Sequence, residues 1–157
     1  MIITVNELLQ SGLPISDEID ETKLERAIST TEQYIIKPRI GDQMYNNILG
    51  NPTEYSTDLN GGYVVDGDRC AYLTGLKTAE YHLVFAMLIN MDIAATSFGT
   101  DVKLNPDVSR PANSEELRRV GMTHTEIGMR FLKEITDWHK IDNSKKNLPN
   151  ILWSEFL

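Results

Sequence analysis

The 157-residue chain has a single cysteine, Cys70, and only three histidines. One cysteine excludes an intramolecular disulfide and a cysteine-based metal site, which favours a reducing compartment. The longest uninterrupted apolar run, residues 83–89, is far shorter than the ~20 residues of a membrane-spanning helix. The N-terminus lacks a basic stretch followed by a long apolar one, so we expect neither a secretory signal nor a membrane partner.

Basic residues are also scarce, with 15 Lys and Arg against 23 Asp and Glu and a net charge of −8. This balance argues against specific binding of nucleic acid, which needs a basic excess. The charge is uneven: residues 1–68 hold 12 acidic and 4 basic side chains, whereas residues 69–157 hold 11 of each. The acidic part either steers a basic partner or serves solubility.

Hydrophobic residues make up 41% of the chain and charged residues 24%, which is typical of one globular domain. Capping-box patterns at Thr4–Glu7 and Thr22–Glu25 predict two helix starts. The second pattern opens an amphipathic helix that Pro38 should stop or kink. Apolar spacing over residues 40–49 then predicts another short helix.

Turn residues dominate the next segment and predict a long exposed loop over residues 50–67. From about Asp68 to Thr96 the chain has no proline and is rich in apolar residues, which predicts a long central helix. Because its apolar residues lie on most sides, other parts of the domain or other subunits must bury it.

A second long loop is predicted over residues 97–112, followed by a helix capped by Asn113 or Ser114. Seven residues at helical spacing form the expected inner face of that helix: Leu117, Val120, His124, Ile127, Phe131, Ile135 and Trp138. The expected fold is therefore all-α, a single domain of four or five helices over residues 1–142. A polar hinge and an apolar docking tail follow over residues 143–157.

Two segments carry apolar side chains suited to binding a partner, namely loop 97–112, as a hairpin or an extended arm, and the tail. The candidate interface residues are Phe98, Val102, Leu104, Val108, Arg110, Ile151, Leu152, Trp153, Phe156 and Leu157. The tail can dock on its own domain or on a neighbouring molecule, and the residues alone leave both alternatives open.

Patterns for catalysis and metal binding are weak. A calcium loop starting at Asp58 would need glycine and glutamate at positions that hold Tyr63 and Arg69. No two histidines have a metal-binding helical spacing, and Cys70 is expected to be a buried small hydrophobe. We expect no catalytic residue, cofactor or metal; a small enzyme built around His124, Cys70 or Asp68 is the alternative.

The run from Leu24 to Ile36, followed by Pro38 to Tyr45, resembles the opening of small head-to-tail connector proteins of tailed phages and Bacteroides-type prophages. The stretch from Ala94 to Gly99 and the stretch from Ser109 to Leu117 are similar too. Together the resemblance covers about residues 22–139.

The resemblance implies a mainly helical structural subunit that forms a ring between the portal and the tail of a phage or prophage particle. Its partners would be copies of itself and the portal and tail proteins, and DNA would pass through the channel without specific binding. Its location would be the virion, and the bacterial host cytoplasm during assembly. The rival hypothesis is a generic helical protein–protein interaction module.

Overall fold

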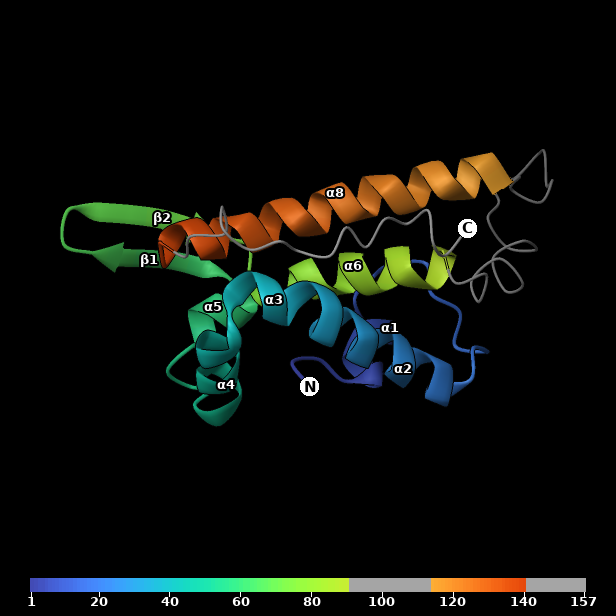
Figure 1. Ribbon diagram of the computed structural model, residues 1–157, viewed down its shortest axis with the longest axis horizontal. Coiled ribbons are helices and arrows are strands. Elements are labelled where there is room, and N and C mark those ends of the chain that lie inside the picture. Colours follow the sequence, from blue (N-terminus) through green and yellow to red (C-terminus); the bar gives the residue numbers. More distant parts are fainter. Residues whose placement is uncertain (91–113, 141–157) are drawn as a thin grey trace.

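The computed structural model describes residues 1–90 and 114–140 (Figure 1). The elements in chain order are α1 (Val5–Leu9), α2 (Glu21–Thr31), the π-helix η1 (Glu32–Ile36), α3 (Lys37–Ile40), α4 (Asp42–Gly50), α5 (Ser56–Asn60), β1 (Gly62–Asp66), β2 (Arg69–Leu73), α6 (Leu76–Asn90) and α8 (Ser114–Trp138). The two long helices α6 and α8 lie side by side and antiparallel, α2 packs against α6, and α3 contacts α8.

Helix α6 is the centre of the core, as the sequence predicts. Every residue from Leu83 to Ile89 is at most 7% exposed, and the neighbours that bury them belong to the same chain. The helix begins at Leu76 rather than near Asp68, because residues 69–73 form a strand. Burial on all sides explains why this stretch shows no single apolar face.

The N-terminal caps confirm one prediction and correct another. Thr4 Oγ1 accepts a hydrogen bond from Glu7 N at 3.2 Å, and Glu7 Oε2 accepts one from Thr4 N at 2.8 Å, which is the expected capping box. The capping box predicted at Thr22 is wrong. Asp20 caps α2 instead, because its Oδ1 accepts from Thr22 N at 2.9 Å.

Pro38 does not stop its helical run. Proline has no backbone N–H, and in an α-helix its ring clashes with the carbonyl four residues earlier. Here the chain widens into the π-helix η1 immediately before α3, so helix α2 continues through η1 into α3. A π-turn relieves such a clash without ending the helix.

The predicted loop over residues 50–67 is wrong for most of its length. It contains the one-turn helix α5 and the strand β1, which pairs antiparallel with β2. Gly67 and Asp68 form the tight turn between the strands, with Gly67 at φ +58°. The chain is therefore mostly helical but not all-α. Residues 1–90 and 114–140 contain six helices, with α2, η1 and α3 counted as one continuous run, rather than four or five.

Two glycines bring backbone segments into contact at the base of this hairpin. A Cβ on Gly75 would lie 2.5 Å from the backbone N of Gly61, and a Cβ on Gly61 would lie 2.6 Å from the carbonyl oxygen of Thr74. Both residues have positive φ, +86° at Gly61 and +100° at Gly75. Only glycine accommodates both the conformation and the close approach.

The buried face of α8 differs in part from the predicted one. Ile135 is fully buried, as expected, whereas Val120 is 36% exposed. Gly121 and Gly128 lie on the buried face instead. Hydrophobic periodicity misses them because glycine has no side chain, although both let α8 approach α6 closely.

These two glycines give a matched test of the contact between α6 and α8. A Cβ on Gly128 would lie 2.6 Å from Leu83 Cγ and 2.9 Å from the Ala79 carbonyl oxygen, so we expect Gly128→Ala to lower the free energy of unfolding by about 1–3 kcal/mol. A Cβ on Gly121 would meet only ordinary contacts at 3.4 Å or more, so Gly121→Ala should be neutral or stabilise by up to about 1 kcal/mol.

Urea denaturation followed by circular dichroism measures both variants against the wild type. Equal effects of the two substitutions would show that α8 does not pack on α6 through Gly128.

Candidate functional site

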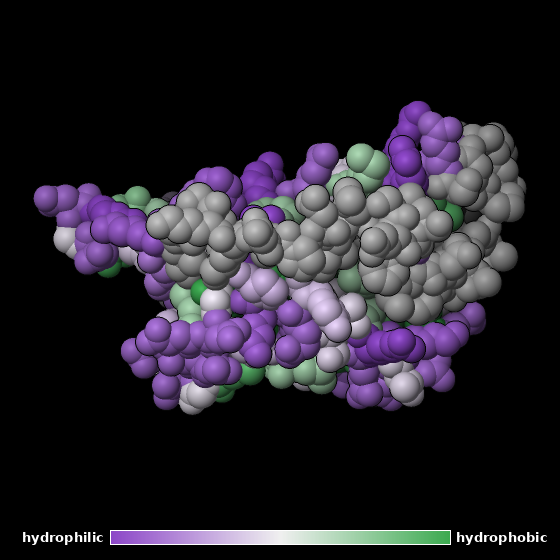
Figure 2. All heavy atoms as spheres, in the orientation of Figure 1, coloured by the Kyte–Doolittle hydropathy of each residue, from purple (hydrophilic) through white to green (hydrophobic). Residues whose placement is uncertain are grey.

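The hairpin of β1 and β2 projects beyond the helices at one end of the molecule (Figure 1). Its outer face carries side chains from both strands: Tyr63 is 77% exposed, Val65 71% and Tyr72 60%, and Cys70 is exposed beside them. Tyr63 and Tyr72 are cross-strand partners with ring centroids 5.1 Å apart. At the projecting end in Figure 2, hydrophobic residues lie beside hydrophilic ones. We call Tyr63, Val65, Cys70 and Tyr72 the outer face of the hairpin.

The opposite face of the hairpin packs against the end of α8. Arg69 Nη2 donates a hydrogen bond to the Trp138 carbonyl oxygen at 3.1 Å, and its guanidinium carbon lies 4.6 Å from the centroid of the Trp138 ring. Arg69 therefore satisfies a carbonyl at the C-terminus of α8 and stacks on its last side chain. This contact fixes the hairpin to the helix.

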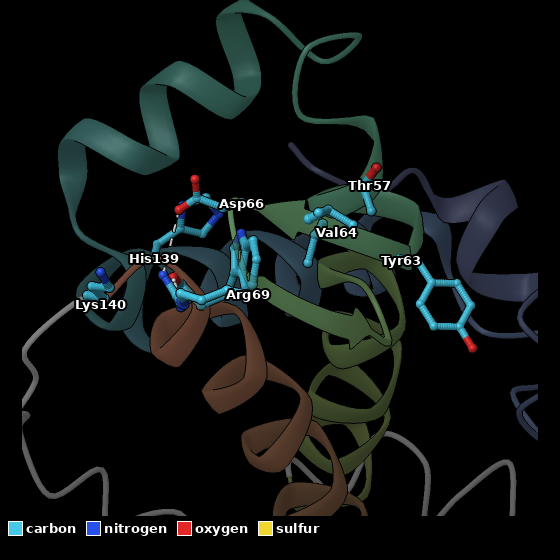
Figure 3. A pocket seen from close by; sticks show the side chains of 9 residues that line it. Thr57, Tyr63, Val64, Asp66, Arg69, His139 and Lys140 are labelled. Carbon is cyan, nitrogen blue, oxygen red and sulfur yellow. Dashed lines mark hydrogen bonds and ion pairs between the residues drawn. The ribbon is translucent and has the colours of Figure 1, made fainter.

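An open hollow of about 570 Å³ lies between β1, α5 and the end of α8 (Figure 3). Asp66, Arg69, His139 and Lys140 contribute charged or titratable groups to its lining, and Tyr63 points away from the other labelled side chains. His139 Nε2 lies 2.6 Å from Oδ1 of Asp58, which is 8% exposed. The hydrogen bond joins α5 to the residue that follows α8.

A histidine pair joins α6 to α8. His82 Nδ1 lies 2.8 Å from His124 Nδ1, and the rings stack with centroids 4.9 Å apart. Burial lowers the pKa of both imidazoles, and the charge of His124 lowers the pKa of His82 further. These surroundings favour the neutral form of both rings, which form one hydrogen-bonded pair in the helix interface. His124 is held by a partner that its sequence spacing does not indicate.

A second buried polar group lies where η1 meets α6. Glu32 is 2% exposed, and its carboxylate accepts hydrogen bonds from Ile2 N and from the Tyr45 hydroxyl, each at 2.5 Å. Glu80 is fully buried nearby, and burial, followed by the charge of Glu32, raises the pKa of the Glu80 carboxyl well above its usual value. Burial likewise raises the pKa of Tyr45. The surroundings of Glu80 therefore favour the protonated form of its carboxyl group.

The residues of the enzyme hypothesis do not come together. Asp68 lies in the hairpin turn, and Cys70 is exposed on β2 rather than buried as expected. His124 is about 21 Å along α8 from Trp138, the residue at which the helix meets the hairpin. Within the described residues, no group of three or more metal-ligating side chains forms a metal site.

All ten candidate interface residues predicted from the sequence lie in residues 91–113 and 141–157, outside the described residues. The outer face of the hairpin is an exposed apolar surface that sequence reasoning missed. Two signals were present, the turn pattern at Asp66-Gly67 and the cross-strand pair of tyrosines three residues before and five residues after it.

Comparisons with known proteins found no match to a family, to a curated protein or to a solved structure. Among residues 1–90 and 114–140, no helix combines the length and the apolar character needed to cross a bilayer.

Proposed function

We propose that this protein is a structural virion protein, a head-to-tail connector subunit that forms a ring between the portal and the tail of a phage or prophage particle. Its place would be the virion, reached from the host cytoplasm during assembly. The protein would act by packing against its neighbours, without a catalytic step.

The observation that carries this proposal is the outer face of the hairpin. Two tyrosines and a valine stand 60–77% exposed on an arm that projects from the helical body. Tyrosine anchors are typical of protein–protein interfaces, because the ring buries a large apolar area while its hydroxyl stays hydrogen-bonded. The resemblance of the sequence to connector proteins supplies the identity of the partners.

The test is co-elution with portal and tail proteins of the same phage or prophage, with the mass of the complex read by light scattering. We expect a stoichiometric complex of several subunits. Replacing Tyr63 and Tyr72 by serine should weaken it at least tenfold, because each tyrosine is an interface anchor.

Tyr34→Ser is the matched control, since Tyr34 is also 60% exposed but lies on η1, away from the hairpin. Absence of any complex with either neighbour would overturn the proposal. If Tyr34→Ser weakened the complex as much as the two hairpin substitutions, the contact would not depend specifically on the hairpin.

The second candidate is a helical protein–protein interaction module with a single partner. The same outer face favours it, since one partner covering the hairpin would bury the same side chains. A complex containing one copy of this chain and one of the partner, rather than several copies, would identify this alternative.

A further inference from the structure

We propose that the outer face of the hairpin binds the apolar segment 148–157 of a second copy of this chain. The inference deepens the proposed connector function, because it names the contact that links one subunit to the next. It joins two surfaces of different kinds, an aromatic face that the structure describes and a chain segment that follows α8.

The hairpin supplies one half of this contact. Its inner face is covered by the end of α8 through Arg69 and Trp138, whereas its outer face is open to solvent. A two-stranded sheet has little stability of its own and gains from cover on both faces. The paired rings of Tyr63 and Tyr72 offer an aromatic surface on which another apolar side chain can stack.

The segment after the hinge supplies the other half. Five large apolar side chains fall within seven residues: Ile151, Leu152, Trp153, Phe156 and Leu157. Tryptophan is among the most enriched anchors in protein interfaces, and here it is flanked by aliphatic and aromatic neighbours.

Charge complementarity indicates how the segment is oriented along the hairpin. The hairpin tip carries the exposed acidic residues Asp66 and Asp68, of which Asp66 pairs with Arg69 at 3.8 Å, whereas Lys145 and Lys146 precede the apolar segment. Tyr72 lies four residues from Asp68, about 13 Å along a strand. Trp153 lies seven residues from Lys146, a reach of up to about 25 Å. The lysines can therefore meet the acidic tip while Trp153 meets the tyrosine pair.

The position of the end of α8 favours a second copy over the same chain. Lys140, the last described residue before the segment, lines the hollow beside Arg69 and Trp138, on the inner side of the hairpin (Figure 3). A segment that docked on its own hairpin would have to turn around the edge of the sheet. A segment from another copy would not have to make this turn.

Disulfide trapping tests the contact, because Cys70 is the only cysteine and lies on the outer face itself. In a Ser154→Cys variant, each chain carries one thiol on the hairpin and one beside Trp153. Under mild oxidation we expect a ladder of cross-linked oligomers on a non-reducing gel. Peptide mass mapping should identify the tail-to-hairpin disulfide, the bond between Cys70 of one chain and the introduced thiol at position 154 of another.

The Ser154→Cys/Cys70→Ser variant and the wild type each have one thiol per chain, so neither can extend beyond a dimer. In the Ser154→Cys background, serine at both Tyr63 and Tyr72 should slow the tail-to-hairpin disulfide at least tenfold, while Tyr34→Ser leaves the rate unchanged. Glutamate at both Lys145 and Lys146, which alters no described residue, should slow the same disulfide at low ionic strength.

A tail-to-hairpin disulfide confined to monomers would overturn the inference, because the segment would then cover its own hairpin. Absence of that bond would overturn it equally. The two proposals remain separable: a complex with the portal protein but no intermolecular disulfide would leave the connector function standing. An intermolecular disulfide without a portal complex would leave the contact between copies and remove the connector.

Discussion

Replacing Gly75 by alanine should lower the free energy of unfolding by more than about 3 kcal/mol. The residue has φ +100°, a conformation that costs an L-residue about 1–2 kcal/mol. In addition, the new Cβ would lie 2.5 Å from Gly61 N and 2.9 Å from the Leu59 carbonyl oxygen. Because both clashing atoms belong to the backbone, the new Cβ fits only if the base of the hairpin moves away from the start of α6.

Urea denaturation measures this loss, and Gly67→Ala is the matched control. Gly67 also has positive φ, +58°, but nothing lies within 4 Å of its Cβ position in the hairpin turn. The control should therefore lose only about 1 kcal/mol, the part due to conformation. A Gly75 variant as stable as the Gly67 variant would show that the two backbone segments do not touch.

Replacing Glu80 by glutamine should remove a large part of the pH dependence of stability. Burial raises the pKa of this carboxyl in the folded protein, whereas in the unfolded chain it titrates near its ordinary value of 4.5. The stabilising contribution of the protonated group is thus fully present below pH 4.5 and is lost as pH rises through the folded-state pKa. Over that window the wild type loses about 1.4 kcal/mol per pH unit through this group.

Glutamine is neutral at every pH and nearly isosteric, so Glu80→Gln should become more stable than the wild type as pH rises from 5 to 8. Urea denaturation at pH 5, 6, 7 and 8 gives the difference. Glu25→Gln, on the exposed side of α2, is the control and should leave the pH profile of the wild type unchanged. Parallel profiles for Glu80→Gln and the wild type would mean that Glu80 is already ionised in the fold.

The long helices were predictable because their patterns are long. A long helix is the element predicted by the apolar run around residues 83–89. The three- and four-residue steps between apolar residues after Ser114 predict another. The structure has helices α6 and α8 at these places. The helix starts were less certain, since Asp20 and Thr22 are both good caps and only two residues apart. In the structure Asp20 is the cap, because its side chain accepts the hydrogen bond from Thr22 N.

The hairpin was missed for a physical reason. An alternating strand signal needs one apolar and one polar face, but here both faces carry apolar side chains. The exposed outer face holds Tyr63, Val65 and Tyr72, whereas the inner face combines Asp66 and Arg69 with Val64, Ala71 and Leu73, of which Leu73 is only 1% exposed. The two strands therefore show no regular alternation of apolar and polar residues in the sequence.

The buried pairs were beyond sequence reasoning for a different reason. Forty-two positions separate His82 from His124 and 48 separate Glu32 from Glu80, so only the packing of helices brings them together. The sequence shows each residue alone, as a histidine or glutamate on a helix.

The contact between Arg69 and Trp138 has a practical consequence, because indole emission depends on what touches the ring. The chain has two tryptophans, Trp138 and Trp153, and Trp153→Phe leaves the one stacked beneath the Arg69 guanidinium. In that variant the whole intrinsic tryptophan signal comes from the point where β2 meets α8. The emission maximum of Trp138 therefore reports, without any attached dye, whether the hairpin stays packed against α8 when a partner binds.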